Sequence, residues 1–534
     1  MSFKKTILTV AAVGALTAAT AVPAMALENE FHGMYKMKYF VSNFDNSAAS
    51  YFGEGTGLTG NTAAAQTAAL ARGTSQTAVN YFEQRARLFY NAKANDDLKL
   101  VVAFEIDSVF GDRSQGGFTG VNTVGGTSGT VNSGTAFRNS GGALDTDSVN
   151  LETKWVHLDF NVPGVPMNVK VGTQAIKDSL KGVLFDCDAG GIWTSTKIGS
   201  NARVNVGYFR GYEGNGGDVN GGGTAGGIGF KMGVNNLDLA ILEGKFNITK
   251  DISVGANYYG YFDYRSNAAT ILDHTLAVNA DAKVGPVALS GFIAGQLGTT
   301  KNQSGSIVGS VNNSNESVDM SGIAANVAAR VKVGPGTAKI AALYTSGDNG
   351  TSQTKNKSWL SLQQSVGGAR LQSNAGALNT YNESGMMLLN RNAAAQGGSS
   401  DKEIAWTTNN RDQGLMLATI GYEATITPKL YANANVGFAW TARDRQNNQN
   451  DVGDTDAIKP LMTNSTTARN SNNYLGTEFN VETGYKLYDN LTASVQAAYV
   501  VLGDYYKGTN QIAGKAGTDP DNPYTARVVL SYVF

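Results

Sequence analysis

Apolar and polar residues alternate along many stretches of this chain. The segments 98–107, 252–259 and 491–501 place apolar residues at every second position, with mostly small or polar residues between them. Successive side chains of a β-strand point to opposite faces, so this pattern predicts strands with one apolar face. The chain is therefore expected to be an all-β protein.

Short turn segments join these strands in pairs. Each contains Gly, Pro, Asn or Asp, which adopt turn geometry with little strain. Eight such turns cover residues 95–97, 163–166, 199–201, 249–251, 285–286, 334–336, 427–429 and 488–490. Together with an opening strand near 30–44 and a closing strand over 524–534, the hairpins predict about 18 strands. Sixteen is the alternative, because the assignment of 226–248 and 347–412 is open.

The remaining connections are mostly longer, and most are rich in Gly, Asn, Ser and Thr. They cover 45–78, 110–150, 174–190, 213–236, 265–271, 299–318, 347–412, 443–472 and 504–522. Short turns at one end and long loops at the other are typical of a transmembrane antiparallel β-barrel, with the turns periplasmic and the loops extracellular. A β-helix, the soluble alternative, would show short repeats without this alternation of loop lengths. Sixteen to eighteen strands enclose a water-filled lumen.

The amino terminus has the features of a secretory signal peptide. Lys4 and Lys5 precede a small, apolar stretch, and Ala24-Met25-Ala26 provides a cleavage pattern. We expect residues 1–26 to be this peptide and residues 27–534 to form a single barrel domain exported through the periplasm. A membrane anchor helix is the weaker alternative, because the apolar stretch is short.

Composition excludes several functions. The chain has 65 Gly, 9 Pro and only 16% charged residues, with a net charge of −1, so nothing suggests a nucleic-acid partner. Cys187 is the only cysteine and there are three scattered histidines, which predicts neither a metal site nor a cofactor. No recognisable catalytic arrangement is present, so we do not expect an enzyme.

Charged residues keep to one face of the predicted strands. A charged side chain facing lipid costs about 2–4 kcal/mol for Arg or Lys near the midplane, so the charged face should line the pore. Both signs occur, with a basic excess, and strong exclusion of either ion type is not expected. The predicted pore-lining residues are Glu83, Arg85, Arg87, Lys99, Glu105, Asp159, Lys170, Arg203, Glu243, Lys245, Asp281, Lys283, Arg330, Glu423, Glu478 and Glu482, with Lys332, Lys339, Lys486 and Arg527 on the same face.

The carboxyl terminus and two internal segments carry a family resemblance. The last strand ends on Tyr532 and Phe534 and resembles the signal read by the barrel assembly machinery of the outer membrane. The segments 82–88 with 98–107, and 169–174, are similar to strands of Gram-negative outer-membrane porins, especially putative porins of metal-reducing delta-proteobacteria.

The resemblance implies a porin for passive diffusion of ions and small hydrophilic solutes. A substrate-selective channel, or a scaffold that sheathes a partner such as an electron-transfer cytochrome, is the alternative. The resemblance to porins also implies contact with outer-membrane lipid and lipopolysaccharide, and assembly as a homotrimer.

In the porin family the third external loop folds inward and faces basic residues of the wall. The corresponding loop here is 174–190, which gives four constriction candidates, Asp178, Lys181, Asp186 and Asp188. They would face Arg85, Arg87 and Arg203. The loop lacks the usual acidic-aromatic-glycine signature, so a surface loop is the alternative. Inward folding of 174–190 and of 347–412 is open from the sequence.

Overall fold

The structure is a computed structural model that describes only part of the chain. It covers residues 28–44, 78–111, 151–214, 235–264, 269–302, 317–348, 352, 354–362, 381–390, 404–405, 408, 410, 413–443, 472–508 and 518–534. The expected signal peptide, residues 1–26, lies outside these residues. Across the described ranges, no helix is long and apolar enough to cross a membrane.

Antiparallel strands make up most of the described residues. Eighteen of the described strands form one ring: β1 (Glu28–Ser42), β2 (Val79–Asn95), β3 (Leu98–Val109), β4 (Glu152–Asn161), β5 (Met167–Lys177), β6 (Asp186–Ile198), β7 (Ala202–Gly214), β8 (Asn235–Asn247), β9 (Ile252–Asp263), β10 (Ala269–Val284), β11 (Val287–Asn302), β13 (Ile323–Val333), β14 (Gly336–Thr345), β16 (Leu415–Thr425), β17 (Leu430–Thr441), β18 (Tyr474–Tyr488), β19 (Leu491–Leu502) and β20 (Tyr524–Val533). Two short strands, β12 (Ser317–Met320) and β15 (Lys355–Asn356), pair in parallel beside the end of β11.

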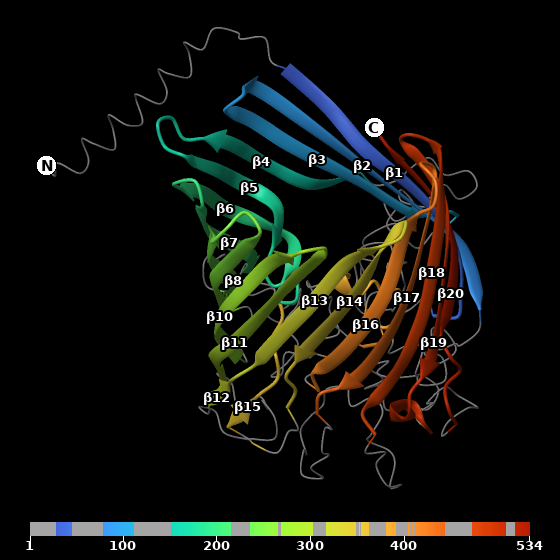
Figure 1. Cartoon of the computed structure of the whole chain (residues 1–534). Helices are drawn as coiled ribbons and strands as arrows, with labels where there is room; N and C mark the ends of the chain where they lie inside the picture. Colours follow the sequence, from blue (N-terminus) through green and yellow to red (C-terminus); the bar gives the residue numbers. More distant parts are fainter. Residues whose placement is uncertain are drawn as a thin grey trace, which may run out of the picture.

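The ring closes where the first strand meets the last (Figure 1). β1 pairs with β2 along its length and with β20 from Met34↔Val533 to Ser42↔Thr525. Phe534 exchanges two further backbone hydrogen bonds with Gly33, at 2.9 and 3.0 Å. The sheet is therefore a barrel without a free edge. The number of about 18 strands and all eight short turns are confirmed.

Two of the turns show why the hairpins are so tight. Val284 pairs with Val287 across Gly285-Pro286, and Val333 pairs with Gly336 across Gly334-Pro335. Both turn glycines have φ of +58°, and proline fixes the next φ near −65°. This combination is a type II′ turn, whose twist matches that of the strands it joins.

The two faces of the wall differ in chemistry. On β10, Leu276 and Val278 are 59% and 54% exposed, whereas Thr275 and Ala277 are almost fully buried. Other strands of the ring also carry exposed apolar side chains on this same face, which suits a hydrocarbon environment. Examples around the ring are Leu158, Val206, Leu242, Ile293, Val327, Ile340, Ile420, Val481 and Val528.

The alternation can be tested on one strand, β11. Ile293 lies on the outward face and is 57% exposed, whereas Ala288 is an exposed residue of the opposite face. We expect Ile293→Arg to lower the free energy of unfolding by about 2–4 kcal/mol in lipid, because the charge enters hydrocarbon. Ala288→Arg, the control on the same strand, should change it little. Urea unfolding in phospholipid vesicles measures both, and equal effects would contradict this assignment of faces.

Candidate functional site

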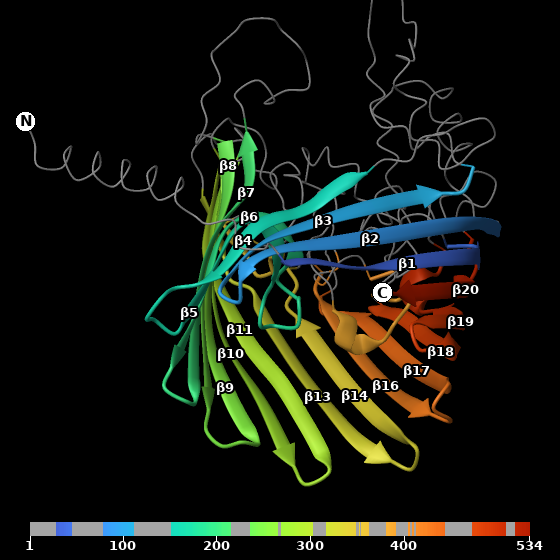
Figure 2. The same ribbon diagram turned by 90° about the horizontal axis from the view of Figure 1, so that it is seen from above.

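Inner and outer faces are identified by contacts that cross the ring. The segments 178–185 and 381–390 contact side chains of β8, β9, β11, β13 and β18 on the face opposite the exposed apolar residues. That face is therefore the inside of the barrel, and Figure 2 shows η1 (Asn382–Ser384) within the ring of strands.

The residues predicted to line a pore occupy these inward positions. Most of them have apolar neighbours on the outward face, as expected from the sequence, and their role in a pore stays a prediction. They are Glu83, Arg85, Arg87, Lys99, Glu105, Asp159, Lys170, Arg203, Glu243, Lys245, Asp281, Lys283, Arg330, Glu423, Glu478 and Glu482.

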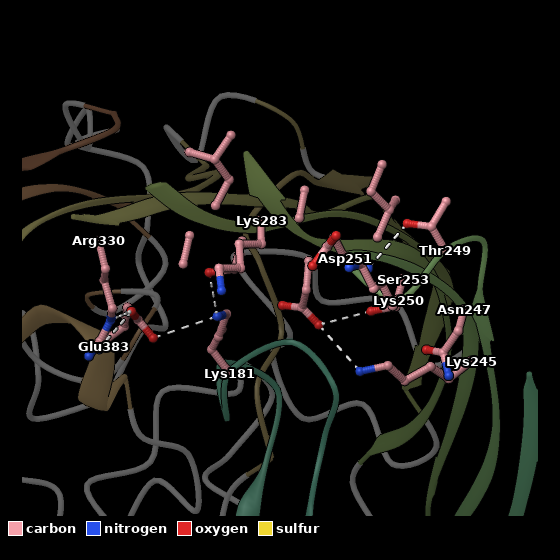
Figure 3. A pocket seen from close by; sticks show the side chains of 16 residues that line it. Lys181, Lys245, Asn247, Thr249, Lys250, Asp251, Ser253, Lys283, Arg330 and Glu383 are labelled. Atoms are coloured by element: carbon pink, nitrogen blue, oxygen red, sulfur yellow. Dashed lines mark hydrogen bonds and ion pairs between the residues drawn. The ribbon is translucent and has the colours of Figure 1, made fainter. Parts of the chain in front are cut away.

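Near the short turns, several of these residues surround a hollow of about 440 Å³ (Figure 3). Lys245 and Asp281 form an ion pair at 3.3 Å, yet their side chains stay 54% and 50% exposed. Charges this exposed inside the ring indicate that water fills this end of the barrel. The charged residues of the hollow are Lys181, Lys245, Lys250, Lys283, Arg330, Asp251, Asp281 and Glu383.

Charges on β1, β2 and β3 are largely paired with one another. Lys38 contacts Glu83 at 2.8 Å, and Arg85 donates to Asp107. Arg87 forms an ion pair with Glu105. Two of the three arginines expected to face a constriction loop, Arg85 and Arg87, are thus neutralised by carboxylates of the neighbouring strand.

The third connection leaves the wall. β5 pairs with β4 only up to Thr173, and β6 pairs with β7 only from Gly190, whereas β5 and β6 continue to pair with each other from 174 to 189. Gly172 and Gly191 face each other where the hairpin departs, and a Cβ on either would clash with a backbone carbonyl of the adjacent strand. The tip of this hairpin, residues 178–185, enters the barrel interior.

Asp178 organises this tip. Its two carboxylate oxygens accept hydrogen bonds from the backbone N–H groups of residues 180, 182, 184 and 185, at 2.6–2.8 Å. Burial raises the pKa of Asp178 to about 6, and the four N–H groups act against this rise by stabilising the charged form. The carboxylate thus accepts the hydrogen bonds that these backbone N–H groups would otherwise make to water, because the turn has no neighbouring strand to pair with.

The tip is fixed to strands farther along the ring, β8 and β11. Ser179 donates to Glu243 and Lys181 donates to Ser290 at 2.8 Å. Lys181 has a φ of +67°, a conformation that costs energy for a residue with a side chain. The packing of the tip holds this conformation in place.

A second segment, 381–390, also lies inside the ring. Tyr381 contacts Asn326 on β13, and the backbone N–H groups of residues 387–389 bond to Glu478 on β18. Glu383 accepts a hydrogen bond from Arg330 at 3.0 Å and forms an ion pair with Lys181 at 3.6 Å. The two inward segments therefore touch each other.

Apolar packing fills the space between these segments and the wall. Leu180, Val183, Trp359, Leu388 and Leu389 are fully buried and belong to one cluster with inward residues of the strands. This cluster was not predicted from the sequence. Its signal was present in the apolar runs 183–185 and 386–389, which occur within connections treated as polar.

The structure corrects the expected arrangement of the constriction loop. Asp186 and Asp188 lie in β6 rather than in the loop. Asp186 pairs with Lys177 and Asp188 with Lys154, both at 2.7 Å. Asp178 accepts backbone N–H groups of the tip, and Lys181 contacts Ser290 and Glu383, so neither charge of the tip is paired with Arg85, Arg87 or Arg203. Arg203 instead lines a second hollow, of about 560 Å³, with Lys170 and Trp193.

Two aromatic residues predicted as an assembly signal lie where the ring closes. Tyr532 and Phe534 stack with ring centres 5.4 Å apart. Within the described ranges, no group of three His, Cys, Asp or Glu residues could hold a metal ion.

Fold and interior together define a class of protein. The chain forms a closed, 18-stranded antiparallel barrel with an apolar outer face and a charged interior, which is the architecture of transmembrane β-barrels.

Comparison with known proteins gave matches among solved structures alone. No protein-family model and no curated protein matches the chain. It is similar to OccAB4 of Acinetobacter baumannii, with 12% identity, a TM-score of 0.48, and 96% of this chain and 100% of that chain covered. It is similar to OccK8 (OprE) of Pseudomonas aeruginosa, with 10% identity, a TM-score of 0.48, and 95% and 98% covered. A BenF-like porin of Pseudomonas fluorescens Pf-5 has 12% identity, a TM-score of 0.46, and 95% and 98% covered.

The contacts of Glu383 predict a dependence on pH. Burial acts to raise its pKa, but Lys181 and Arg330 outweigh burial and hold the pKa below its usual value of 4.5. A lowered pKa in the folded state gives stability that is present above the usual pKa and is lost as pH falls through the folded one. We expect Glu383→Gln to be less stable than the unsubstituted chain at neutral pH, with the difference shrinking below about pH 4.5. Denaturant unfolding in detergent over a pH series measures this, and a constant difference at all pH values would contradict it.

Proposed function

We propose that the protein is an outer-membrane pore for passive diffusion of ions and small hydrophilic solutes. One observation carries the proposal, namely a closed ring that is apolar outside and holds exposed charged side chains inside. Lys245, Asp281, Arg330 and Glu423 are each more than two-fifths exposed on the inner face. Charged groups remain this exposed only where water reaches them.

The interior supports a pore with weak ion selectivity. Charges of both signs occur in the hollow of Figure 3, with basic residues in excess. A scaffold that sheathes another protein is disfavoured, because this chain's own segments 178–185 and 381–390 occupy part of the interior. A channel for one defined substrate lacks an observation in its favour.

The cellular context follows from the same proposal. The chain is exported with residues 1–26 as its signal peptide, and the assembly machinery reads the strand that ends on Tyr532 and Phe534. The apolar outer face contacts outer-membrane lipid and lipopolysaccharide, and the barrel assembles as a homotrimer. The resemblance to porins of metal-reducing delta-proteobacteria remains a hypothesis about its nearest relatives.

Recording in planar lipid bilayers tests the pore directly. The purified, refolded barrel should give discrete current steps that rise linearly with voltage, because the passage is filled with water. Reversal potentials in a salt gradient should show weak selectivity. A folded, inserted barrel without any conductance would overturn the proposal.

A charge reversal in the hollow should shift that selectivity. Lys283→Glu places a negative charge on the inner face near Lys245 and Asp281. We expect the cation-to-anion permeability ratio to rise roughly two- to fourfold at low salt, an effect that shrinks as salt screens the charge. Lys429→Glu in an exposed short turn is the control and should change the ratio less. Equal shifts in both variants would show that the hollow is not on the ion path.

A further inference from the structure

We propose that Glu243 and Glu478 are positioning residues that hold a bridge of chain across the barrel interior and thereby set the bore of the pore. The bridge consists of the segments 178–185, 354–362 and 381–390. The inference rests on the proposed function for its effect on conductance, whereas the anchoring itself is a separate structural claim.

The Glu478 carboxylate holds one end of the bridge. Glu478 lies on β18 and is completely buried. One oxygen accepts the backbone N–H of Met387 at 2.6 Å and the side-chain amide of Asn480 at 2.8 Å. The other oxygen accepts the backbone N–H groups of Leu388 and Leu389, at 3.0 and 2.7 Å. An inward carboxylate predicted to face water is therefore covered by three consecutive amides of an interior segment.

Glu243 holds the other end in the same manner. It lies on β8, is 7% exposed, and accepts the hydroxyl groups of Ser179 and Tyr259, both at 2.7 Å. The backbone N–H of Ser179 donates to the same oxygen at 3.2 Å, and Asn205 donates to the other oxygen at 3.2 Å. Both oxygens of this buried carboxylate are therefore paired with donors.

The segments between the two anchors form one connected body. Leu362 donates its backbone N–H to the carbonyl of Leu184 at 2.9 Å. Lys181 pairs with Glu383 at 3.6 Å, which joins the first segment to the third. Figure 3 shows this pair beside Arg330, which ties Glu383 to β13.

The positions of the anchors explain why this body acts as a bridge. Passing from β8 through β9, β10, β11, β13, β14, β16 and β17 to β18 takes eight strand pairings out of the eighteen that close the ring. Glu243 and Glu478 therefore lie nearly opposite each other. A body fixed at both points divides the cross-section of the barrel and narrows the path left for solutes.

Carboxylates suit this task because they only accept hydrogen bonds. Each carboxylate oxygen of Glu478 accepts hydrogen bonds from two N–H donors. In Glu478→Gln, an NH₂ group replaces one of these oxygens. Because NH₂ is itself a donor, it cannot pair with the two N–H groups that it would then face. Losing such buried hydrogen bonds should shift the ratio of released to docked segment by roughly 10- to 100-fold. Glu482→Gln is the matched control, because Glu482 also points inward on β18 but bonds to Tyr431 and Asn433 of the wall.

Two measurements on the full chain in lipid test the proposal. Hydrogen exchange should show slow exchange at the amides of residues 387–389 in the unsubstituted chain and in Glu482→Gln, and faster exchange in Glu478→Gln. Bilayer recording should show larger or additional conductance levels in Glu478→Gln and in Glu243→Gln. Vesicles that carry either of these two variants should also admit larger neutral sugars than vesicles that carry the unsubstituted chain.

The double variant distinguishes one bridge from two independent loops. If a single body is held at both ends, freeing one end releases most of it, and Glu243→Gln combined with Glu478→Gln should add little to either single variant. Circular dichroism shows whether each variant still forms the barrel. If one single variant does not fold, the hydrogen exchange and conductance of the other single variant test the bridge.

Failure of the inference and failure of the proposed function give different results. Unchanged exchange and unchanged conductance in both single variants of a conducting barrel would overturn the bridge. Faster exchange in Glu478→Gln with no conductance in any form would support the anchor and overturn the pore.

Discussion

Backbone pairing between β1 and β20 is the constraint on which the rest of the structure depends. In hydrocarbon an unpaired N–H or C=O costs several kcal/mol, so a sheet is stable there only without edges. The register from Met34↔Val533 to Ser42↔Thr525, extended by the bonds between Gly33 and Phe534, removes both edges of this sheet. Closure also fixes which side chains point inward. A shift by one residue anywhere in the ring would exchange the two faces of a strand.

Closure leaves an interior that the strands alone do not fill, and the chain uses that space in two ways. Near the short turns the inner face keeps exposed charges, such as Lys245 and Asp281, in water. Further along the barrel, the segments 178–185 and 381–390 enter the interior and pack in an apolar cluster. Buried backbone N–H groups of these segments donate hydrogen bonds to the carboxylates of Asp178 and Glu478. Glu478 thus ties segment 381–390 to β18 of the wall, whereas Asp178 orders the hairpin tip itself.

The sequence predicted the wall far better than the interior. Alternation in segments such as 98–107 and turns such as Gly285-Pro286 are local signals, and they were sufficient for the strands, turns and inward parity of residues such as Arg330 and Glu482. The paths of long connections depend on contacts between residues far apart in the chain. Glu478 and residues 387–389 are one example, and Lys181 and Glu383 are another. The alternation of residues along the strand placed Glu478 on the inner face. It could not show that residues 387–389 cover this side chain. The expected opposition between the third loop and Arg85 or Arg87 failed because Asp107 and Glu105 on β3 already neutralise both arginines.

The closed barrel requires that every second residue of the ring meets lipid while its neighbours meet water. Spin labels attached to single cysteines on β10, in a Cys187→Ser background, test it most directly. In lipid vesicles, labels at Leu276, Val278 and Ala280 should respond to dissolved oxygen, and labels at Asn279, Asp281 and Lys283 should respond to a water-soluble nickel chelate. That alternation is the result the closed barrel predicts. Equal accessibility at both sets of positions, or lipid contact at Asp281 and Lys283, would contradict it.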